Sequence, residues 1–294
     1  MGSAGELCKT LYKTSPSPRA GEPLQANGTS SHGADNSIPL NLSDHAGSRL
    51  TSENHQPVWI ISSGAYTAVN RAGSKPEIAC VANAGALASF AQAFAITGGR
   101  PLQIRTSFTF SDSCGVPYRP DQDWHPLGVY RTTKADSEQA VITRKKVDKC
   151  CILGASWVHG SMVRNFFLIM PRLMRERKIV RVVDAQESRP TAVPRLAAAF
   201  WSFLHHNVQG IQQWSDARVA SWHDFAVAIA ELSRKSALLE KSVHIWPIKA
   251  ADFPTPARRP SYSLLDRRLT RIALHFPGQH WRSAPSQAIN DVLA

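Results

Sequence analysis

The alternation of apolar, strand-like runs with longer helix-like segments is the feature that most restricts how this chain can fold. The strand-like runs lie at residues 58–61, 102–110, 150–158 and 179–183, and the helix-like segments lie at 76–97, 127–145, 165–177 and 192–206. Strands that alternate with helices of this length are typical of βαβ units, in which consecutive strands run parallel. We therefore predict an α/β fold built on a parallel sheet.

Local signals mark several element ends. Ser43-Asp44 is suited to capping a short helix that runs to about Asn54, because small polar side chains accept hydrogen bonds at a helix N-terminus. Ser221-Trp-His-Asp224 has the form of a capping box before a helix that reaches about Arg234. Residues 12–38 are rich in Ser, Pro, Gly and Asn and predict loop or disorder.

The charge balance limits the partners. The chain has 294 residues, 43% hydrophobic residues and a net charge of +12, which indicates a globular protein whose surface attracts polyanions. Nucleic acid, anionic lipid and a pyrophosphate-bearing ligand all satisfy that charge. The sequence has no basic helix with interleaved aromatic residues and no known nucleic-acid motif, so a nucleic-acid partner is not expected.

Cysteine usage and hydropathy bear on the compartment. The five cysteines form no C-x-x-C pair, which argues against a zinc site or a disulfide framework and favours reduced thiols in the cytoplasm. Residues 78–96 carry no charge and are about long enough to span a bilayer, but the segment is rich in alanine and contains Asn83, Ser89 and Gln92. We interpret it as a helix packed on the sheet and expect no membrane partner. The histidines show no metal-ligand spacing, and no metal site is predicted.

Two short motifs suggest chemistry. Gly2-Ser-Ala-Gly5-Glu6-Leu7-Cys8 is a glycine-containing turn of the kind that lets a backbone approach a pyrophosphate, but the signal is weak by itself and these residues alone favour a disordered start. Tyr130 and Lys134 are four residues apart, which puts both on one face of a helix. A lysine ammonium lowers the pKa of a nearby tyrosine and makes it a usable proton donor near neutral pH.

Several segments, in order, resemble the dTDP-4-dehydrorhamnose reductase family of the extended short-chain dehydrogenase/reductase superfamily. They are Ala65–Ala72, Pro76–Ala84, Thr106–Asp112, Pro117–Lys134, Ser156–His159, Val182–Gln186, Ala220–Phe225, Phe253–Pro260 and Trp281–Arg282. The A-Y-T-A-V, Y-x-x-x-K and P-T-P-A-R-R-P segments together are specific, and the resemblance covers roughly residues 38–285. It implies a Rossmann-type parallel sheet with helices on both faces and a small C-terminal substrate-binding region.

The resemblance also implies residue roles. Tyr130 would donate the proton, assisted by Lys134 and Thr106. The residues implied to bind NADPH or NADH are Gly5, Glu6, Leu7, Asn41, Leu42, Ala65, Tyr66, Thr67, Tyr130 and Lys134. Those implied to bind the nucleotide sugar are Thr106, Ser107, Trp157, Arg258 and Arg259. The implied reaction is the reduction of dTDP-4-dehydro-6-deoxy-L-mannose to dTDP-L-rhamnose.

Departures from the family pattern keep a second interpretation open. Cys8 replaces a glycine of the phosphate turn, and Ser107 and Phe108 replace an aspartate and a tyrosine. Thr10 stands where the family can carry a glutamate that helps bind magnesium between subunits, so we expect that magnesium ligand to be lost. The alternative function is a catalytically impaired, nucleotide-binding relative that acts as a regulatory subunit.

The expected organisation has two parts. Residues 1–150 would form the dinucleotide-binding domain, with residues 1–37 poorly ordered and the first strand missing. Residues 151–294 would supply the remaining sheet elements and the substrate-binding region. A homodimer is kept as an option for the assembly.

Overall fold

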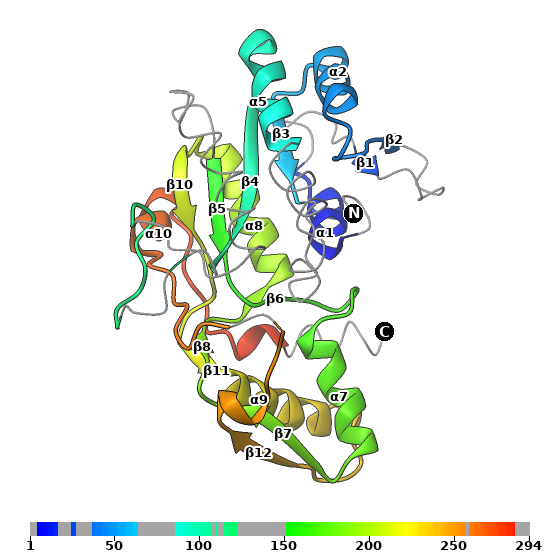
Figure 1. The fold of residues 1–294 in the computed structure, drawn as a ribbon, viewed down its shortest axis with the longest axis vertical. Coiled ribbons are helices and arrows are strands. Elements are labelled where there is room, and N and C mark those ends of the chain that lie inside the picture. The colour runs from blue at the N-terminus through cyan, green and yellow to red at the C-terminus, as the bar shows by residue number, and fades with distance from the viewer. Residues whose placement is uncertain are drawn as a thin grey trace.

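A parallel sheet forms the centre of the molecule. The computed structural model describes residues 5–16, 25–27, 37–63, 86–107, 110, 115–122, 151–256 and 259–285. The sheet strands are β3 (Trp59–Ser62), β4 (Arg100–Thr106), β5 (Cys151–Ala155) and β10 (Gly210–Gln213). They run parallel in the order β10-β5-β4-β3, as Figure 1 shows. The predicted α/β class is confirmed.

Helices cover both faces of this sheet, as β3 illustrates. Trp59 and Ile61 pack toward a cluster formed with α1 (Glu6–Lys13) and α8 (Val193–His205). Ile60, between them, packs on Phe90 and Phe94 of α5 (Ala86–Thr97). Successive side chains of a strand point to opposite faces, so α1 and α8 lie on one face and α5 on the other.

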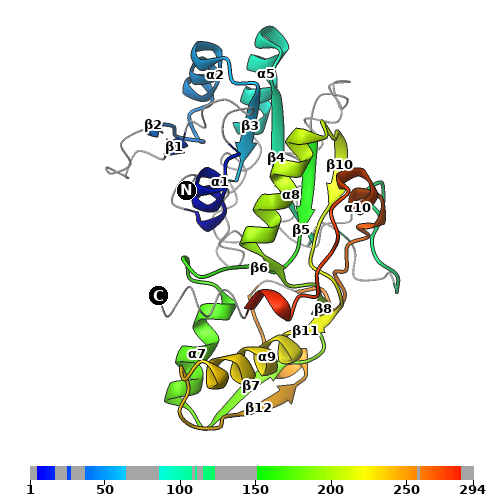
Figure 2. The same ribbon diagram turned by 180° about the vertical axis from the view of Figure 1, so that it is seen from behind.

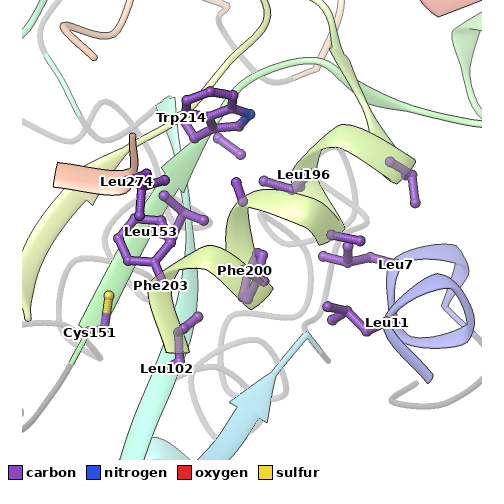
Figure 3. Packing of buried hydrophobic residues seen from close by; sticks show 14 residues of the cluster. Leu7, Leu11, Leu102, Cys151, Leu153, Leu196, Phe200, Phe203, Trp214 and Leu274 are labelled. Carbon is purple, nitrogen blue, oxygen red and sulfur yellow. The ribbon is translucent and has the colours of Figure 1, made fainter. Parts of the chain in front are cut away.

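The larger core lies between α8 and the sheet. Figure 3 shows Phe203 of α8 beside Leu153 of β5 and Leu102 of β4, with Phe200 of α8 on the side of the cluster that faces α1. Leu7 of α1 closes one side of this cluster. These side chains are at most 8% exposed, so the face of α8 with apolar residues at helical spacing is the face that is buried.

A small lobe lies beyond one end of the sheet (Figure 2). Its helices are α7 (Phe166–Glu176) and α9 (Trp222–Lys235), and its parallel strand pair is β7 (Ile179–Val183) with β12 (His244–Ile248). Two short strand pairs lie where the chain passes between the lobes. They are β6 (Val158–His159) with β9 (Thr191–Ala192), and β8 (Glu187–Ser188) with β11 (Ala220–Ser221). Because the passage occurs several times, the small lobe is not a simple C-terminal appendage.

The predicted caps are present. The Asp44 carboxylate accepts the N–H of Gly47 at 2.9 Å at the start of α2 (His45–His55). Ser221 and Asp224 form the predicted capping box at the start of α9. Pro171 lies buried inside α7, which continues past it to Glu176.

Other elements were not foreseen. Within residues 1–37, where poor order was expected, the structure places α1 and β1 (Gln25–Asn27), and β1 pairs with β2 (Ser37–Pro39). The strands β10 and β12, the 3₁₀ turn η4 (Ala250–Asp252) and α10 (Arg268–Leu274) had no prediction. Among the described residues, no helix has both the length and the apolar character needed to cross a bilayer.

Candidate active site at the carboxyl edge of the sheet

The carboxyl ends of the parallel strands bring predicted site residues together. Thr106 ends β4 and is the register partner of Ala155, which ends β5. Ser107 and Ser156 follow these strand ends, and each is 2% exposed. Since ligands of open parallel sheets bind beyond the carboxyl ends of the strands, this edge is the candidate active site.

Trp157 stands at this edge in a strained backbone conformation. Its φ is +44°, in the left-handed region that residues other than glycine rarely adopt. Such strained residues are concentrated at functional sites. Its indole stacks on Trp222 with ring centroids 3.7 Å apart and an interplanar angle of 13°. Phe166 packs against Trp222 in turn, at 4.6 Å. The predicted sugar contact is therefore held in an aromatic wall.

The opposite side of the edge carries buried charge. Asp216, after β10, is fully buried and pairs with Arg195 at 3.3 Å. Its carboxylate also accepts the N–H of Ala192, at the start of α8, at 3.2 Å. Burial raises the pKa of Asp216 to about 6, although Arg195 opposes that shift. This pair ties the end of β10 to the N-terminus of α8.

Further arginines surround this charged side. Arg267 donates to the main-chain oxygen of Ser215 at 2.8 Å, and burial, with help from Arg189 and Arg271, lowers its pKa to about 10. Arg189 donates to the main-chain oxygen of Leu265 at 2.5 Å, and burial lowers its pKa as well. Half-buried cations held close together favour an anionic ligand.

One of the two arginines predicted to grip a diphosphate is described. Arg259 is half-buried, and burial lowers the pKa of its guanidinium. Among the described residues its Nε atom is buried and has no hydrogen-bond partner. Ser261, two residues further on, accepts the N–H of Glu187 at 2.7 Å, which places this loop beside β8. Arg258 lies outside the described residues.

The predicted phosphate turn is partly visible at α1. Gly5 is the N-cap of α1, and no side chain caps this helix. Leu7 is 8% exposed and points into the larger core. The Glu6 carboxylate accepts the main-chain N–H groups of Met162, at 2.9 Å, and Val163, at 3.3 Å. The side chains of Glu6 and Leu7 are thus used in contacts within the protein, while Gly5 leaves the N-terminus of α1 without a side-chain cap.

The other predicted cofactor residues divide into two groups. Asn41 is exposed and accepts the N–H of Ser43 at 3.0 Å, and Leu42 packs on the Phe90 and Phe94 cluster. Five predicted residues lie outside the described part of the chain: Ala65, Tyr66, Thr67, Tyr130 and Lys134. Only the backbone of Thr106 is described. The geometry of the catalytic set therefore stays a prediction.

Thr10, at the family's magnesium position, is 7% exposed in α1, and its main-chain oxygen accepts the Thr14 hydroxyl at 2.8 Å. Among the residues that the structure describes, no group of three His, Cys, Asp or Glu side chains is placed to hold a metal ion.

A separate groove lies between α9 and β12, with a volume of about 290 Å³. Val227, Leu239 and Val243 line it together with His223 and His244. None of the predicted site residues contributes to this lining, so the groove is distinct from the candidate site.

Sequence reasoning did not identify the partners that hold these residues. Trp222 lies inside the recognised capping-box segment, but its stacking on Trp157 joins two distant segments of the chain. The pairing of Asp216 with Arg195 and the contact of Glu6 with residues 162–163 are equally non-local. No spacing in the sequence signals such contacts.

Solved structures with the same fold agree with this architecture. A dTDP-4-dehydrorhamnose reductase from Clostridium acetobutylicum superposes with a TM-score of 0.86 at 23% identity, covering 99% of this chain and 97% of that one. The Bacillus anthracis dTDP-4-dehydrorhamnose reductase, solved in complex with NADP, gives a TM-score of 0.84 at 23% identity with the same coverage.

Sequence relatives narrow the family. A dTDP-4-dehydrorhamnose reductase from Streptomyces griseus is 31% identical over 254 residues, which are 85% of this chain and 82% of the relative. The Mycobacterium tuberculosis (strain H37Rv) dTDP-4-dehydrorhamnose reductase is 32% identical over 236 residues, 78% of this chain and 75% of its own length. The family described as RmlD substrate binding domain matches residues 1–294. The chain therefore belongs to the dTDP-4-dehydrorhamnose reductase family.

Proposed function

We propose that this protein reduces dTDP-4-dehydro-6-deoxy-L-mannose to dTDP-L-rhamnose, with NADPH or NADH as the reductant. The observation that supports this most is the register of β4 and β5, which sets Thr106 beside Ala155 and so brings Thr106 and Trp157 to one edge. Relatives that are 31% and 32% identical to this chain carry the name of this activity.

The described residues fit a dinucleotide. The N-terminus of α1 has no side-chain cap, so its main-chain N–H groups suit a pyrophosphate. Gly5, Glu6 and Leu7 would contribute through their main chain, and Asn41 and Leu42 would contact the nucleoside end. Ala65, Tyr66 and Thr67 would complete the binding surface. The bound cofactor supplies a hydride.

The chain's own residues would handle the proton. Tyr130 protonates the oxygen of the keto group as the carbonyl carbon is reduced. Lys134 lowers the pKa of Tyr130 by its positive charge and holds the cofactor ribose. Thr106 hydrogen-bonds at the same oxygen and orients it.

The substrate would lie between the two sides of the carboxyl edge. Trp157 offers an aromatic face to a ring, and Ser107 is buried next to the end of β4. Arg258 and Arg259 would bind the diphosphate, because guanidinium groups match phosphate oxygens in geometry and charge. A homodimer in the cytoplasm is the proposed setting, and the reduced thiols of Cys8 and Cys151 are compatible with a reducing compartment.

The decisive experiment follows reduced-cofactor consumption with the keto sugar as substrate. Tyr130→Phe keeps the ring and removes only the hydroxyl, so kcat should fall by about 10²- to 10⁴-fold while nucleotide-sugar affinity changes little. Tyr12→Phe, an exposed tyrosine on α1, is the matched control and should keep full activity.

Two results would redirect the proposal. A Tyr130→Phe variant with the full wild-type rate would refute the tyrosine–lysine mechanism. A wild-type protein that binds nucleotide sugar but does not turn it over would favour the regulatory relative instead, which the replacements at Ser107 and Phe108 already suggest.

A further inference from the structure

Glu6 makes a contact that joins the two lobes. It is the first residue of α1 and is only 9% exposed. Its two carboxylate oxygens accept the consecutive N–H groups of Met162 and Val163, at 2.9 and 3.3 Å. α1 belongs to the sheet lobe, whereas these N–H groups belong to residues 160–165, which we call the latch loop and which lead into α7.

The latch loop is closed by its own hydrogen bonds. The Asn165 side chain donates to the main-chain oxygens of Gly160, at 2.8 Å, and Val163, at 2.7 Å. The same side chain accepts the N–H of Leu168 and so caps α7. Asn165 thereby holds the loop in the shape that presents its N–H groups to Glu6.

Apolar packing contributes little to the position of this loop. The side chains of Met162 and Val163 are 45% and 41% exposed, so they anchor it weakly. Gly160 leaves the space that the Glu6 carboxylate fills, since a Cβ atom there would overlap that carboxylate. Burying a carboxylate costs free energy unless hydrogen bonds compensate, and the two N–H groups provide that compensation.

The latch loop is attached at both ends to the aromatic wall of the candidate site. Trp157 precedes it by three residues, and Phe166 follows it directly. Phe166 packs on Trp222, on which Trp157 is stacked. A movement of the loop would therefore displace the wall from both sides.

We propose that Glu6 is a positioning residue for the nucleotide sugar: by holding the latch loop against α1, it fixes the Trp157 indole relative to the start of α1. This inference rests on the proposed function, because it assigns Trp157 to the sugar site and the start of α1 to the cofactor site. Glu6 acts through the loop and contacts neither ligand with its carboxylate, whose negative charge would repel a pyrophosphate.

The test compares wild type with Glu6→Ala and Glu6→Gln. Amide hydrogen exchange at Met162 and Val163 should become about tenfold faster in Glu6→Ala, which loses charge-assisted hydrogen bonds, and less so in Glu6→Gln, which keeps one acceptor oxygen. The KM for the keto sugar and the Kd for dTDP-L-rhamnose should rise about tenfold in Glu6→Ala, with kcat within about twofold of wild type. Glu176→Ala removes an exposed ion pair on α7 and should change neither readout.

Each outcome separates the inference from the function beneath it. Faster exchange with unchanged KM and Kd would make Glu6 purely structural and overturn the proposal. Unchanged exchange would show that the hydrogen bonds to the latch loop do not hold it, and would overturn the proposal as well. A wild type with protected latch-loop amides that neither binds dTDP-L-rhamnose nor reduces the keto sugar would refute the proposed function itself, and the positioning role with it. Should Glu6→Ala fail to fold, Glu6→Gln alone decides: its KM for the keto sugar should lie between that of wild type and a value about tenfold higher.

Discussion

The two sides of the carboxyl edge are built from different kinds of buried groups. On the sheet side, Asp216 is fully buried beside Arg195, and Arg267 reaches the same segment through Ser215. On the small-lobe side, the His159 ring lies among aromatic rings, with its centroid 4.9 Å from that of Phe225 and 5.9 Å from that of Phe167. One side is therefore built around a buried ion pair, and the other around aromatic rings.

This difference suits a ligand that is itself two-sided. A nucleotide sugar has an anionic diphosphate, which favours cations, and flat or ring-shaped parts, which favour aromatic faces. The difference between the two sides also predicts that Asp216 and His159 affect stability in opposite ways as the pH changes. Burial disfavours the charged form of each side chain. The neutral form of a carboxylic acid exists at low pH, whereas the neutral form of an imidazole exists at high pH.

The largest effect is expected from the aromatic side. Phe225 contacts His159, Phe166, Trp222 and Trp281, so Phe225→Ala removes a shared packing partner. We expect a loss of about 3–5 kcal/mol in the free energy of unfolding, measured by denaturant titration. Leu269→Ala, at an exposed position of α10, is the control and should cost much less. A similar loss in both would mean that the aromatic side is not a packed wall.

The pH response of His159 comes next. Burial lowers the pKa of His159 to about 4 from its ordinary 6.5. The neutral ring is thus favoured in the fold, and the free energy of unfolding should decrease as the pH falls from about 6.5 to 4, by about 3–4 kcal/mol for this group. In His159→Gln that slope should disappear from the stability profile. An identical slope in the variant would assign the acid sensitivity to other groups.

Asp216 should respond in the opposite direction. Its folded pKa of about 6 lies above the ordinary 3.8, because burial outweighs the attraction of Arg195. The protonated form is favoured in the fold, so the contribution of this group to stability is greatest below about pH 4 and declines by about 3 kcal/mol as the pH rises to 6. Denaturant midpoints of Asp216→Asn across this range should lack the decline. Parallel profiles for variant and wild type would contradict the burial argument.

The smallest effect concerns the start of α9, on which Trp222 stands. The Ser221 hydroxyl accepts the N–H of Asp224 at 3.0 Å, and the Asp224 carboxylate accepts the N–H of Ser221 at 2.9 Å. Ser221→Ala should therefore lower the free energy of unfolding by about 1 kcal/mol, seen as a shift in the denaturant midpoint. Ser242→Ala, at an exposed serine, should leave the midpoint unchanged.

The parts of the fold that were predicted from the sequence are those set by local pattern. The 179–183 run is strand β7, and the helices at 165–177 and 192–206 are α7 and α8 within a residue or two. The caps at Asp44 and Ser221 were also readable, because a cap needs only a polar side chain two or three residues from the N–H that it accepts. The strands β10 and β12 escaped prediction, since Gly210–Gln213 is mostly polar and His244–Ile248 contains a proline.

The sequence by itself determined the α/β class, the family and the candidate residues, because periodicity and motif spacing are local properties of a chain. Only the tertiary structure decided that Trp157 stacks on Trp222, that Asp216 pairs with Arg195, and that the Glu6 carboxylate accepts the N–H groups of Met162 and Val163. These contacts join residues 21 to 157 positions apart. Which residues meet depends on how the sheet and the small lobe bring distant segments together. It also depends on the requirement that each buried charged group has a hydrogen-bond or ion-pair partner.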